Sequence, residues 1–185
     1  MPRPLSEKLL ALAAKTAEGG EAVRRALADL VSETAPFDAG EIVTAPERYP
    51  LGALSEGEVL AAPDLLGSLA SVGSPLRFDD WEDMGGFPGT LERLRALGLR
   101  SLLALPFGGG EAALILARRQ GWGFAGAPVP ELASLARMAG LALGWARDRA
   151  AFDRRVEALR REIIAGREER EAASPRRAQK RPPGR

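Results

Sequence analysis

The sequence predicts an α+β domain in which a central antiparallel sheet is flanked by helices and followed by a long C-terminal helix. Two apolar segments, Ser101–Pro106 and Ala112–Arg118, are separated by a glycine-rich stretch, which is typical of a hairpin of central strands. A helical repeat of apolar residues begins at about Pro128, and another covers residues 5–17. The sheet is therefore expected between helices at both ends of the chain.

Two short amphipathic helices are predicted before the sheet. Leucine and alanine recur at helical spacing in residues 5–17, and the glycine pair that follows ends or kinks this helix. A second helix, about Glu21–Glu33, has an apolar stripe that includes Val23 and Leu27. Helices this short are not stable alone in water, so each must pack on the rest of the domain.

The middle of the chain alternates short strands and helices. Strands are expected at Ala39–Thr44 and Leu51–Leu54, with a further short strand at Glu58–Ala61. The next elements are predicted, in order, as a helix at Asp64–Val72, a strand at Pro75–Asp80, a loop at Trp81–Pro88 and a helix from Thr90 to about Leu97. A proline at the start of a strand favours a sheet edge.

The order of these segments resembles the GAF domain family. The likeness is carried by Arg77-Phe-Asp-Asp80, by Ser101–Pro106, by Leu114–Arg118, and by the stretch from Phe124 through Pro128 to Leu132. The resemblance covers roughly residues 20–150 and rests on order and spacing. It implies a GAF- or PAS-like antiparallel sheet flanked by helices, with a pocket on the face opposite the terminal helices. It also implies small-molecule sensing or simple dimerisation, as in a stand-alone bacterial GAF-domain protein.

Cysteine and histidine are both absent, and this absence excludes several functions. Disulfides, thiol nucleophiles and zinc–thiolate sites need cysteine, and an imidazole base or haem ligand needs histidine. Free methionine sulfoxide reductases, bilin-binding domains and haem-binding domains of the resembled fold are excluded for the same reason. The Asn-Lys-x-x-x-Phe-x-x-x-Asp-Glu signature of its cyclic-nucleotide binders has no counterpart here. We therefore expect no catalytic residues, no metal and no cofactor.

The candidate ligand site surrounds an acidic loop. Its residues are Arg77, Asp79, Asp80, Trp81, Phe87 and Ser101. The loop is the densest carboxylate cluster of the chain and could hold a hard cation or a polar ligand. The alternative is a solvated loop in which one aspartate caps a turn. The one enzymatic alternative uses Asp79, Asp80 or Glu82 with a metal, and no nucleophile accompanies these carboxylates.

Two of these candidates have structural alternatives of their own. Arg77 points away from its apolar strand neighbours, so it faces either an anionic ligand or water and a neighbouring acid. Phe87 follows two glycines and either forms part of a mobile lid or anchors a flexible connector.

The final helix carries a heptad seam that predicts a coiled-coil homodimer. Apolar residues recur in alternating steps of three and four over about four heptads, with Arg149 as a charged interruption. The predicted interface comprises Leu5, Leu9, Leu12, Trp145, Phe152, Val156, Leu159 and Ile163. An exposed stripe of this size needs a cover, most simply the same helix of a second copy. The alternative is that it folds back onto the N-terminal helix, and both can hold in a four-helix interface.

The chain is predicted to divide into four parts. These are an N-terminal helix at residues 1–19, a GAF-like sensory domain at 20–150, a helical extension with the heptad seam at 151–173, and a disordered basic tail at 174–185. The tail could hold nucleic acid phosphates or an acidic partner, but no aromatic is interleaved, so a solubilising terminus is favoured. A net charge of +1, no secretion signal and no bilayer-length apolar run predict a cytoplasmic protein without membrane or nucleic acid partners.

The sequence thus predicts a sensor rather than an enzyme. The leading hypothesis is a homodimeric GAF-like signalling domain that binds an unidentified small cytoplasmic ligand and signals to a partner protein through its terminal helices. The alternative is a ligand-free dimerisation and protein-interaction module. Filling the pocket with bulky residues would separate the two hypotheses, because only the sensor needs the pocket open.

Overall fold

The computed structural model describes residues 3–44, 47–107 and 112–173. The predicted basic tail and the glycine-rich stretch at 108–110 lie outside these ranges. The chain forms two compact units, Met1–Arg147 and Asp148–Arg185.

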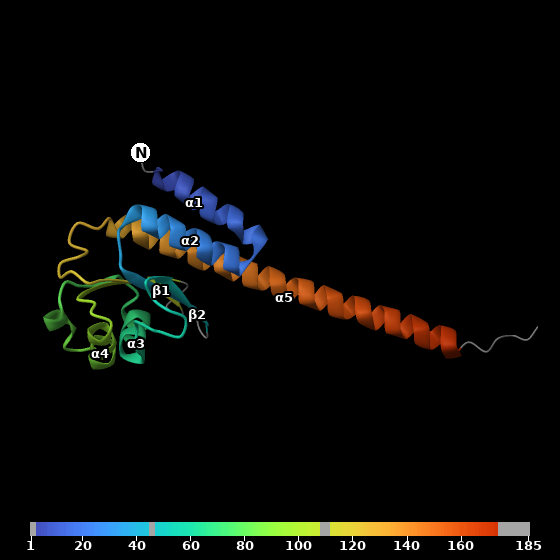
Figure 1. Ribbon diagram of the computed structural model, residues 1–185. Coiled ribbons are helices and arrows are strands. Elements are labelled where there is room, and N and C mark those ends of the chain that lie inside the picture. Colours follow the sequence, from blue (N-terminus) through green and yellow to red (C-terminus); the bar gives the residue numbers. More distant parts are fainter. Residues whose placement is uncertain (1–2, 45–46, 108–111, 174–185) are drawn as a thin grey trace, which may run out of the picture. The chain divides into compact units, whose positions relative to one another are not determined.

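An antiparallel sheet is the centre of the first unit (Figure 1). Among the described residues it has five strands: β1 (Ala39–Thr44), β2 (Glu47–Gly52), β3 (Leu76–Phe78), β4 (Ser101–Phe107) and β5 (Ala112–Arg118). Their spatial order is β2-β1-β5-β4-β3, which places β2 and β3 at the edges. The predicted fold class, an α+β domain with a central antiparallel sheet, is confirmed.

Strands β4 and β5 are buried on both faces of the sheet, which explains their nearly continuous apolar sequence. In β4, Leu103 and Leu105 belong to the core on one face, whereas Leu102 and Ala104 belong to the core on the other. The prediction that these two segments are neighbouring central strands is confirmed.

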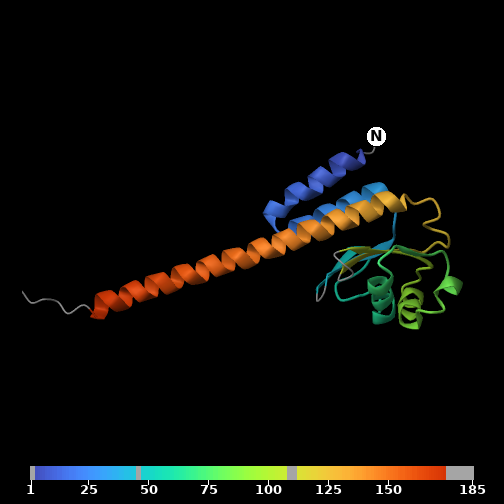
Figure 2. The same cartoon turned by 180° about the vertical axis from the view of Figure 1, so that it is seen from behind.

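Three helices lie on one side of the sheet: two cover its face, and the N-terminal helix packs on the outer side of those two (Figures 1 and 2). They are α1 (Leu5–Ala14), α2 (Gly20–Thr34) and, within the first unit, the beginning of α5 (Val129–Ala173). Leu27 of α2 and Leu135 of α5 are fully buried in the core that these helices share with the strands. The burial of one apolar stripe on each helix supplies the stability that their short lengths lack.

Helix α1 is also fixed by a buried lysine. Lys8 is 2% exposed, and its Nζ donates to Thr34 Oγ1 at 2.7 Å and to Glu131 Oε1 at 2.8 Å. The ammonium group therefore joins α1 to both α2 and α5. A charge this deeply buried is tolerated because it is paired and hydrogen-bonded.

Helices α3 (Pro63–Val72) and α4 (Pro88–Ala96) cover the opposite face. Each begins with a proline, which suits the first turn of a helix. The Asp64 carboxylate of α3 accepts hydrogen bonds from Gly89 N–H, Thr90 N–H and Thr90 Oγ1 at 2.8, 3.3 and 2.7 Å. Asp64 thus caps the N-terminus of the neighbouring helix and holds the two together.

The second unit contains the continuation of α5 as far as Ala173. Its apolar residues at heptad spacing are largely open to solvent: Phe152 is 66%, Leu159 is 51% and Ile163 is 58% exposed, and Val156 is half-buried. No helix in the described part of the chain has the length and apolar content needed to cross a membrane.

Two strand predictions and one loop prediction are corrected by the structure. The second strand occupies Glu47–Gly52 and shares only its last two residues with the predicted segment Leu51–Leu54. The segment Glu58–Ala61 is not a strand, because Glu58 N–H closes a turn with the Ser55 carbonyl and the chain then enters the core. The predicted loop after β3 begins with a short 3-10 helix, η2 (Trp81–Met84).

The predicted dimer contacts of the N-terminal helix are used within the chain itself. Leu12 is fully buried, and Leu5 and Leu9 are partly buried against the same core. Leu12 is therefore removed from the predicted interface, because a side chain without exposed surface cannot contact a second copy. Trp145, in contrast, is 60% exposed.

Candidate functional site

The acidic loop that follows β3 uses its carboxylates to hold itself together. Asp80 Oδ1 accepts the Trp81 N–H at 2.7 Å, and Asp83 Oδ2 accepts the N–H groups of Asp79 and Asp80 at 3.0 and 3.1 Å. This reciprocal pattern is a capping box at the start of η2. The Trp81 N–H lowers the pKa of Asp80, and an ion pair with Arg100 lowers it further against the opposing effect of desolvation. The loop is therefore a self-capped turn.

Arg77 and Asp79 pair with each other at the edge of the same loop. Arg77 Nη2 lies 3.3 Å from Asp79 Oδ2. Asp79 is only 8% exposed, and its Oδ1 accepts no hydrogen bond from the described residues. Of the two predicted roles for Arg77, the ion pair with a neighbouring acid is the one present.

Trp81 is anchored by a hydrogen bond and by two cations. Its Nε1 donates to the Leu99 carbonyl at 2.6 Å. The guanidinium carbons of Arg95 and Arg100 lie 5.4 and 5.5 Å from the centre of its ring, within the range of cation–π attraction. The indole thus fastens the loop to the start of β4.

The last two predicted site residues are also in packed positions. The Phe87 ring meets Phe78 edge to face, with ring centres 5.2 Å apart. Ser101 is fully buried, and its Oγ donates to the Gln120 carbonyl at 2.8 Å. The structure therefore groups the six predicted residues near β3 and the start of β4, where the contacts described for them are structural.

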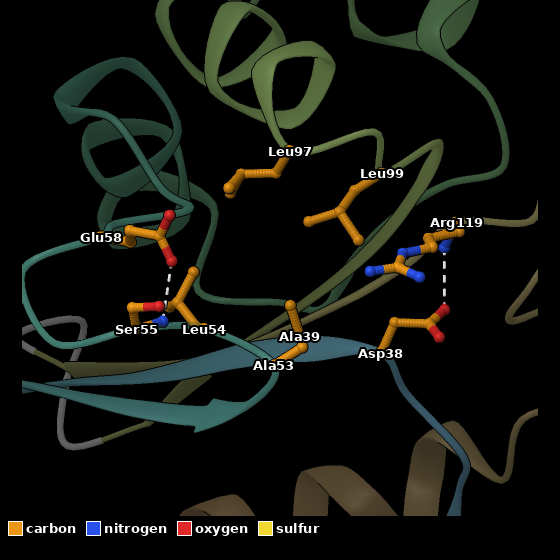
Figure 3. A pocket seen from close by; sticks show the side chains of 9 residues that line it. All are labelled: Asp38, Ala39, Ala53, Leu54, Ser55, Glu58, Leu97, Leu99 and Arg119. Atoms are coloured by element: carbon orange, nitrogen blue, oxygen red, sulfur yellow. Dashed lines mark hydrogen bonds between the residues drawn. The ribbon is translucent and has the colours of Figure 1, made fainter.

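A separate pocket of about 160 Å³ lies on the α3/α4 side of the sheet (Figure 3). None of the six predicted residues is among the described residues that line it. Its lining comes from the start of β1, the turn after β2, the link between α4 and β4, and the end of β5. The residues are Asp38, Ala39, Ala53, Leu54, Ser55, Glu58, Leu97, Leu99 and Arg119.

Backbone hydrogen bonds fix the wall around Asp38. Asp38 N–H donates to the Ala117 carbonyl at 3.0 Å, and Ala53 N–H donates to the Asp38 carbonyl at 2.9 Å. The Asp38 carboxylate accepts Arg119 N–H through Oδ2 at 2.9 Å. Gly52 makes this approach possible, because it adopts φ +62° and a Cβ there would lie 2.7 Å from the Asp38 carbonyl oxygen.

The pocket combines an apolar wall with charged groups at its rim. Leu97 and Leu99 lie along one side, and the carboxylate of Glu58 and the guanidinium of Arg119 lie at its two ends (Figure 3). Glu58 is held in place by the Ser55 N–H, which donates to its Oε2 at 2.7 Å. Such a lining suits a small ligand with an apolar body and polar ends.

The same sheet face also carries an ion pair whose carboxylate is fully buried. Glu41 of β1 is fully buried and lies on the same face as Ala39 and Val43. Arg48 Nη1 donates to both Glu41 oxygens at 3.2 and 3.1 Å, and Ala61 N–H donates to Oε1 at 2.6 Å. The carboxylate is therefore well satisfied.

A second arginine joins this cluster. Arg48 Nη1 and Arg93 Nη1 both donate to the Ala61 carbonyl, at 2.9 and 2.8 Å. The Ala61 backbone lies outside any strand, so its buried N–H and C=O have no ladder partner and take side-chain partners instead. The side chains of this cluster come from β1, β2 and α4, and none of them is among the described residues that line the pocket.

Sequence-based prediction missed both the pocket residues and this cluster. Glu41 had a usable signal, because it is a lone charge in the apolar strand segment Ala39–Thr44. Asp38 and Arg119 had none, because they meet only through the pairing of β1 with β5, in which Ala39 lies opposite Ala117. The sequence of one strand alone does not determine which residues of a distant strand lie opposite it.

The comparisons with known proteins fit this geometry at the level of the fold. No protein-family model matches the chain, and no curated protein matches it either. Among solved structures, it is similar to the GAF domain of a putative sensor histidine kinase from Pseudomonas syringae pv. tomato. The TM-score is 0.51 at 18% sequence identity, and the match covers 82% of this chain and 92% of that one. The fold is GAF-like.

This finding confirms the resemblance inferred from the segment order as far as the fold is concerned. A similarity at 18% identity does not carry over ligands, partners or residue roles. Those have to be argued from the pocket and the helices of this chain.

Proposed function

We propose that this chain is a sensory domain that binds a small cytoplasmic molecule in the Asp38–Arg119 pocket and passes the change to a partner protein through its terminal helices. The observation that carries the proposal is the pocket itself, with apolar walls and charged groups at its rim. A catalytic role is not part of the proposal.

The connections of the pocket residues suggest how a bound molecule would act. Asp38 lies in the short link between α2 and β1, and Arg119 begins the loop between β5 and α5. A ligand that contacts both residues would favour the conformations in which the α2–β1 link and the β5–α5 loop lie close enough together for both contacts to form. The effect is a population shift, limited by the difference in ligand affinity between the two states.

The dimer is the proposed route of the signal out of the domain. Residues Phe152, Leu159 and Ile163 of the second unit are exposed at heptad spacing. A parallel pairing of two copies of α5 would bury this row and give a coiled coil whose helix spacing can respond. Replacing Phe152 with Glu is expected to give monomers in size-exclusion chromatography with light scattering, whereas the off-seam control Ala158→Glu stays dimeric.

A ligand-free dimerisation and interaction module is the second candidate. It is favoured by the size of the pocket, since 160 Å³ is below the range of about 300–1,000 Å³ typical of small-molecule sites. The Glu41–Arg48 pair also occupies part of the face on which the resemblance placed the pocket. In this case the domain binds no ligand and serves only to hold the helices that contact a second copy or a partner protein.

Native mass spectrometry of protein purified gently from its own source separates the two candidates. The sensor predicts a dimer with additional mass, and this mass should be lost in Ala53→Trp, which places an indole in the pocket. The matched control is Ala70→Trp, at an exposed position on α3. A dimer without additional mass in the unmodified chain, with partner binding unchanged by Ala53→Trp, contradicts the sensor and supports the interaction module.

A further inference from the structure

The pocket carries charges of both signs that do not neutralise each other. Among the described residues, the Arg119 guanidinium forms no ion pair, although Arg119 N–H donates to Asp38 Oδ2 at 2.9 Å. Asp38 keeps Oδ1 and Glu58 keeps Oε1 beyond the hydrogen bonds that each accepts from the backbone. A positive group and two negative groups thus border one small space.

From these charges we infer that the pocket binds a small α-amino acid with a short aliphatic side chain. The inference rests on the proposed function, in which this pocket holds a ligand. The α-carboxylate would pair with the Arg119 guanidinium, whose planar donors suit a carboxylate. The α-ammonium group would pair with the carboxylate of Asp38 or of Glu58.

The apolar lining of the pocket determines which side chain the bound amino acid can have. Leu54, Leu97, Leu99 and two alanines form the apolar lining, and the described residues that line the pocket include no aromatic ring on which a planar base could stack. The volume of about 160 Å³ corresponds to about five water molecules at ~30 Å³ each. Such a space admits an aliphatic side chain of the size of that of alanine, valine or leucine, and no nucleotide.

Single-charge ligands fit the rim less well. A simple carboxylate would pair with Arg119 but leave its own apolar end beside Asp38 and Glu58. A simple amine would pair with a carboxylate but approach the unpaired guanidinium. A zwitterion can pair with the guanidinium and with a carboxylate at the same time. Repulsion between like charges then disfavours simple carboxylates and simple amines.

The test uses valine and its two single-charge analogues on the full chain. Isothermal titration calorimetry with L-valine, 3-methylbutanoate and isobutylamine compares ligands with the same branched body. L-valine is expected to bind at least tenfold more tightly than either analogue, with L-alanine and L-leucine measured alongside it. A preference for either analogue over all three amino acids overturns the inference.

Charge-removing variants assign the contacts. Arg119→Gln is expected to weaken L-valine binding at least tenfold and to remove its advantage over isobutylamine. Asp38→Asn and Glu58→Gln keep an acceptor for Arg119 N–H and Ser55 N–H, so they remove charge with little change of structure. One of the two should weaken L-valine tenfold or more. Arg25→Gln, at an exposed position on α2, is the control and should bind as the unmodified chain does.

Failure of the inference is distinguishable from failure of the proposed function. If none of the three amino acids binds, but the native protein carries a different molecule that Ala53→Trp removes, the sensor stands and the amino-acid inference is overturned. If no amino acid binds and no additional mass is present, both are overturned. Binding of an amino acid that survives Ala53→Trp also contradicts the inference, because the site then lies elsewhere.

Discussion

The two faces of the sheet are stabilised in different ways, although the same strands supply both. The side of the sheet with α1, α2 and α5 has an apolar core, and Lys8 is a buried charged residue on this side. The face under α3 and α4 mixes apolar residues with the buried polar side chains of Glu41 and Thr90.

The difference follows from what covers each face. Long helices satisfy their own backbone, so their packing needs only apolar side chains. The other face is covered partly by irregular chain, and buried N–H groups there need acceptors. Ala61 N–H donates to Glu41 at 2.6 Å, and Ala62 N–H donates to Thr90 Oγ1 at 3.0 Å. A face built from loops and side-chain hydrogen bonds is also the one that can carry a polar pocket.

The largest effect is expected from removing the buried carboxylate. Glu41→Ala leaves the Ala61 N–H without its acceptor and Arg48 without its anionic partner, and should lower the free energy of unfolding by about 3–5 kcal/mol. Urea unfolding measures the loss. The control Glu47→Ala removes an exposed partner of Arg24 and should cost at most about 1 kcal/mol. A loss below that of the control would contradict a polar-stabilised face.

A large-to-small change on the other face tests the apolar half of the comparison. Leu27→Ala opens a cavity beneath α2 and should cost about 2–5 kcal/mol in the free energy of unfolding. Leu27→Met, which nearly conserves volume, should cost less than about 1.5 kcal/mol, because this core requires volume and not a hydrogen bond. Equal losses for the two variants in urea unfolding would show that the face depends on more than apolar volume.

The buried lysine is the exception that sharpens the comparison. Lys8→Met keeps the apolar stem but removes the hydrogen bonds to Thr34 and Glu131, and should cost about 1.5–3 kcal/mol. Limited proteolysis should then cleave faster between α1 and α2. Lys15→Met removes an exposed pair with Glu18 and serves as the control. Unchanged proteolysis in Lys8→Met would mean that apolar packing alone holds α1.

The sequence predicted the elements whose signals are local. Strands β1 and β5 were predicted at their observed bounds, and α3 and β4 to within one residue, because apolar spacing and turn residues mark them directly. The edge strand β2 was misplaced, because Pro50 and a half-buried Tyr49 interrupt the alternation that identifies a strand.

The candidate site was far less predictable than the fold. A dense run of acids attracted the prediction to Asp79 and Asp80, but the Asp80 carboxylate accepts the Trp81 N–H and pairs with Arg100, and Asp79 pairs with Arg77. The pocket draws Asp38 and Arg119 from opposite ends of paired strands. The register of β1 against β5 brings these two residues together, and this register cannot be inferred from the hydrophobic periodicity of either strand.

The smallest effect concerns the cap between α3 and α4, and it depends on pH. Partial burial of the Asp64 carboxyl would raise its pKa, but hydrogen bonds from the Thr90 hydroxyl and from the N–H groups of Leu65, Gly89 and Thr90 outweigh this and lower the pKa. A carboxyl with a lowered pKa in the folded state adds stability above its unfolded pKa, about 3.9 for aspartate. This contribution is lost as the pH falls through the folded value.

The variant Asp64→Asn isolates this contribution. At pH 7 it should lower the free energy of unfolding by about 1 kcal/mol, as for the loss of a helix cap. The difference from the unmodified chain should shrink as the pH falls below about 3.9, because Asp64 itself then becomes neutral. Urea unfolding at several pH values measures both, with Asp29→Asn on an exposed position of α2 as the control. A difference that stays constant with pH would mean that Asp64 acts through its shape and not its charge, and the polar face would then rest on Glu41 and Thr90.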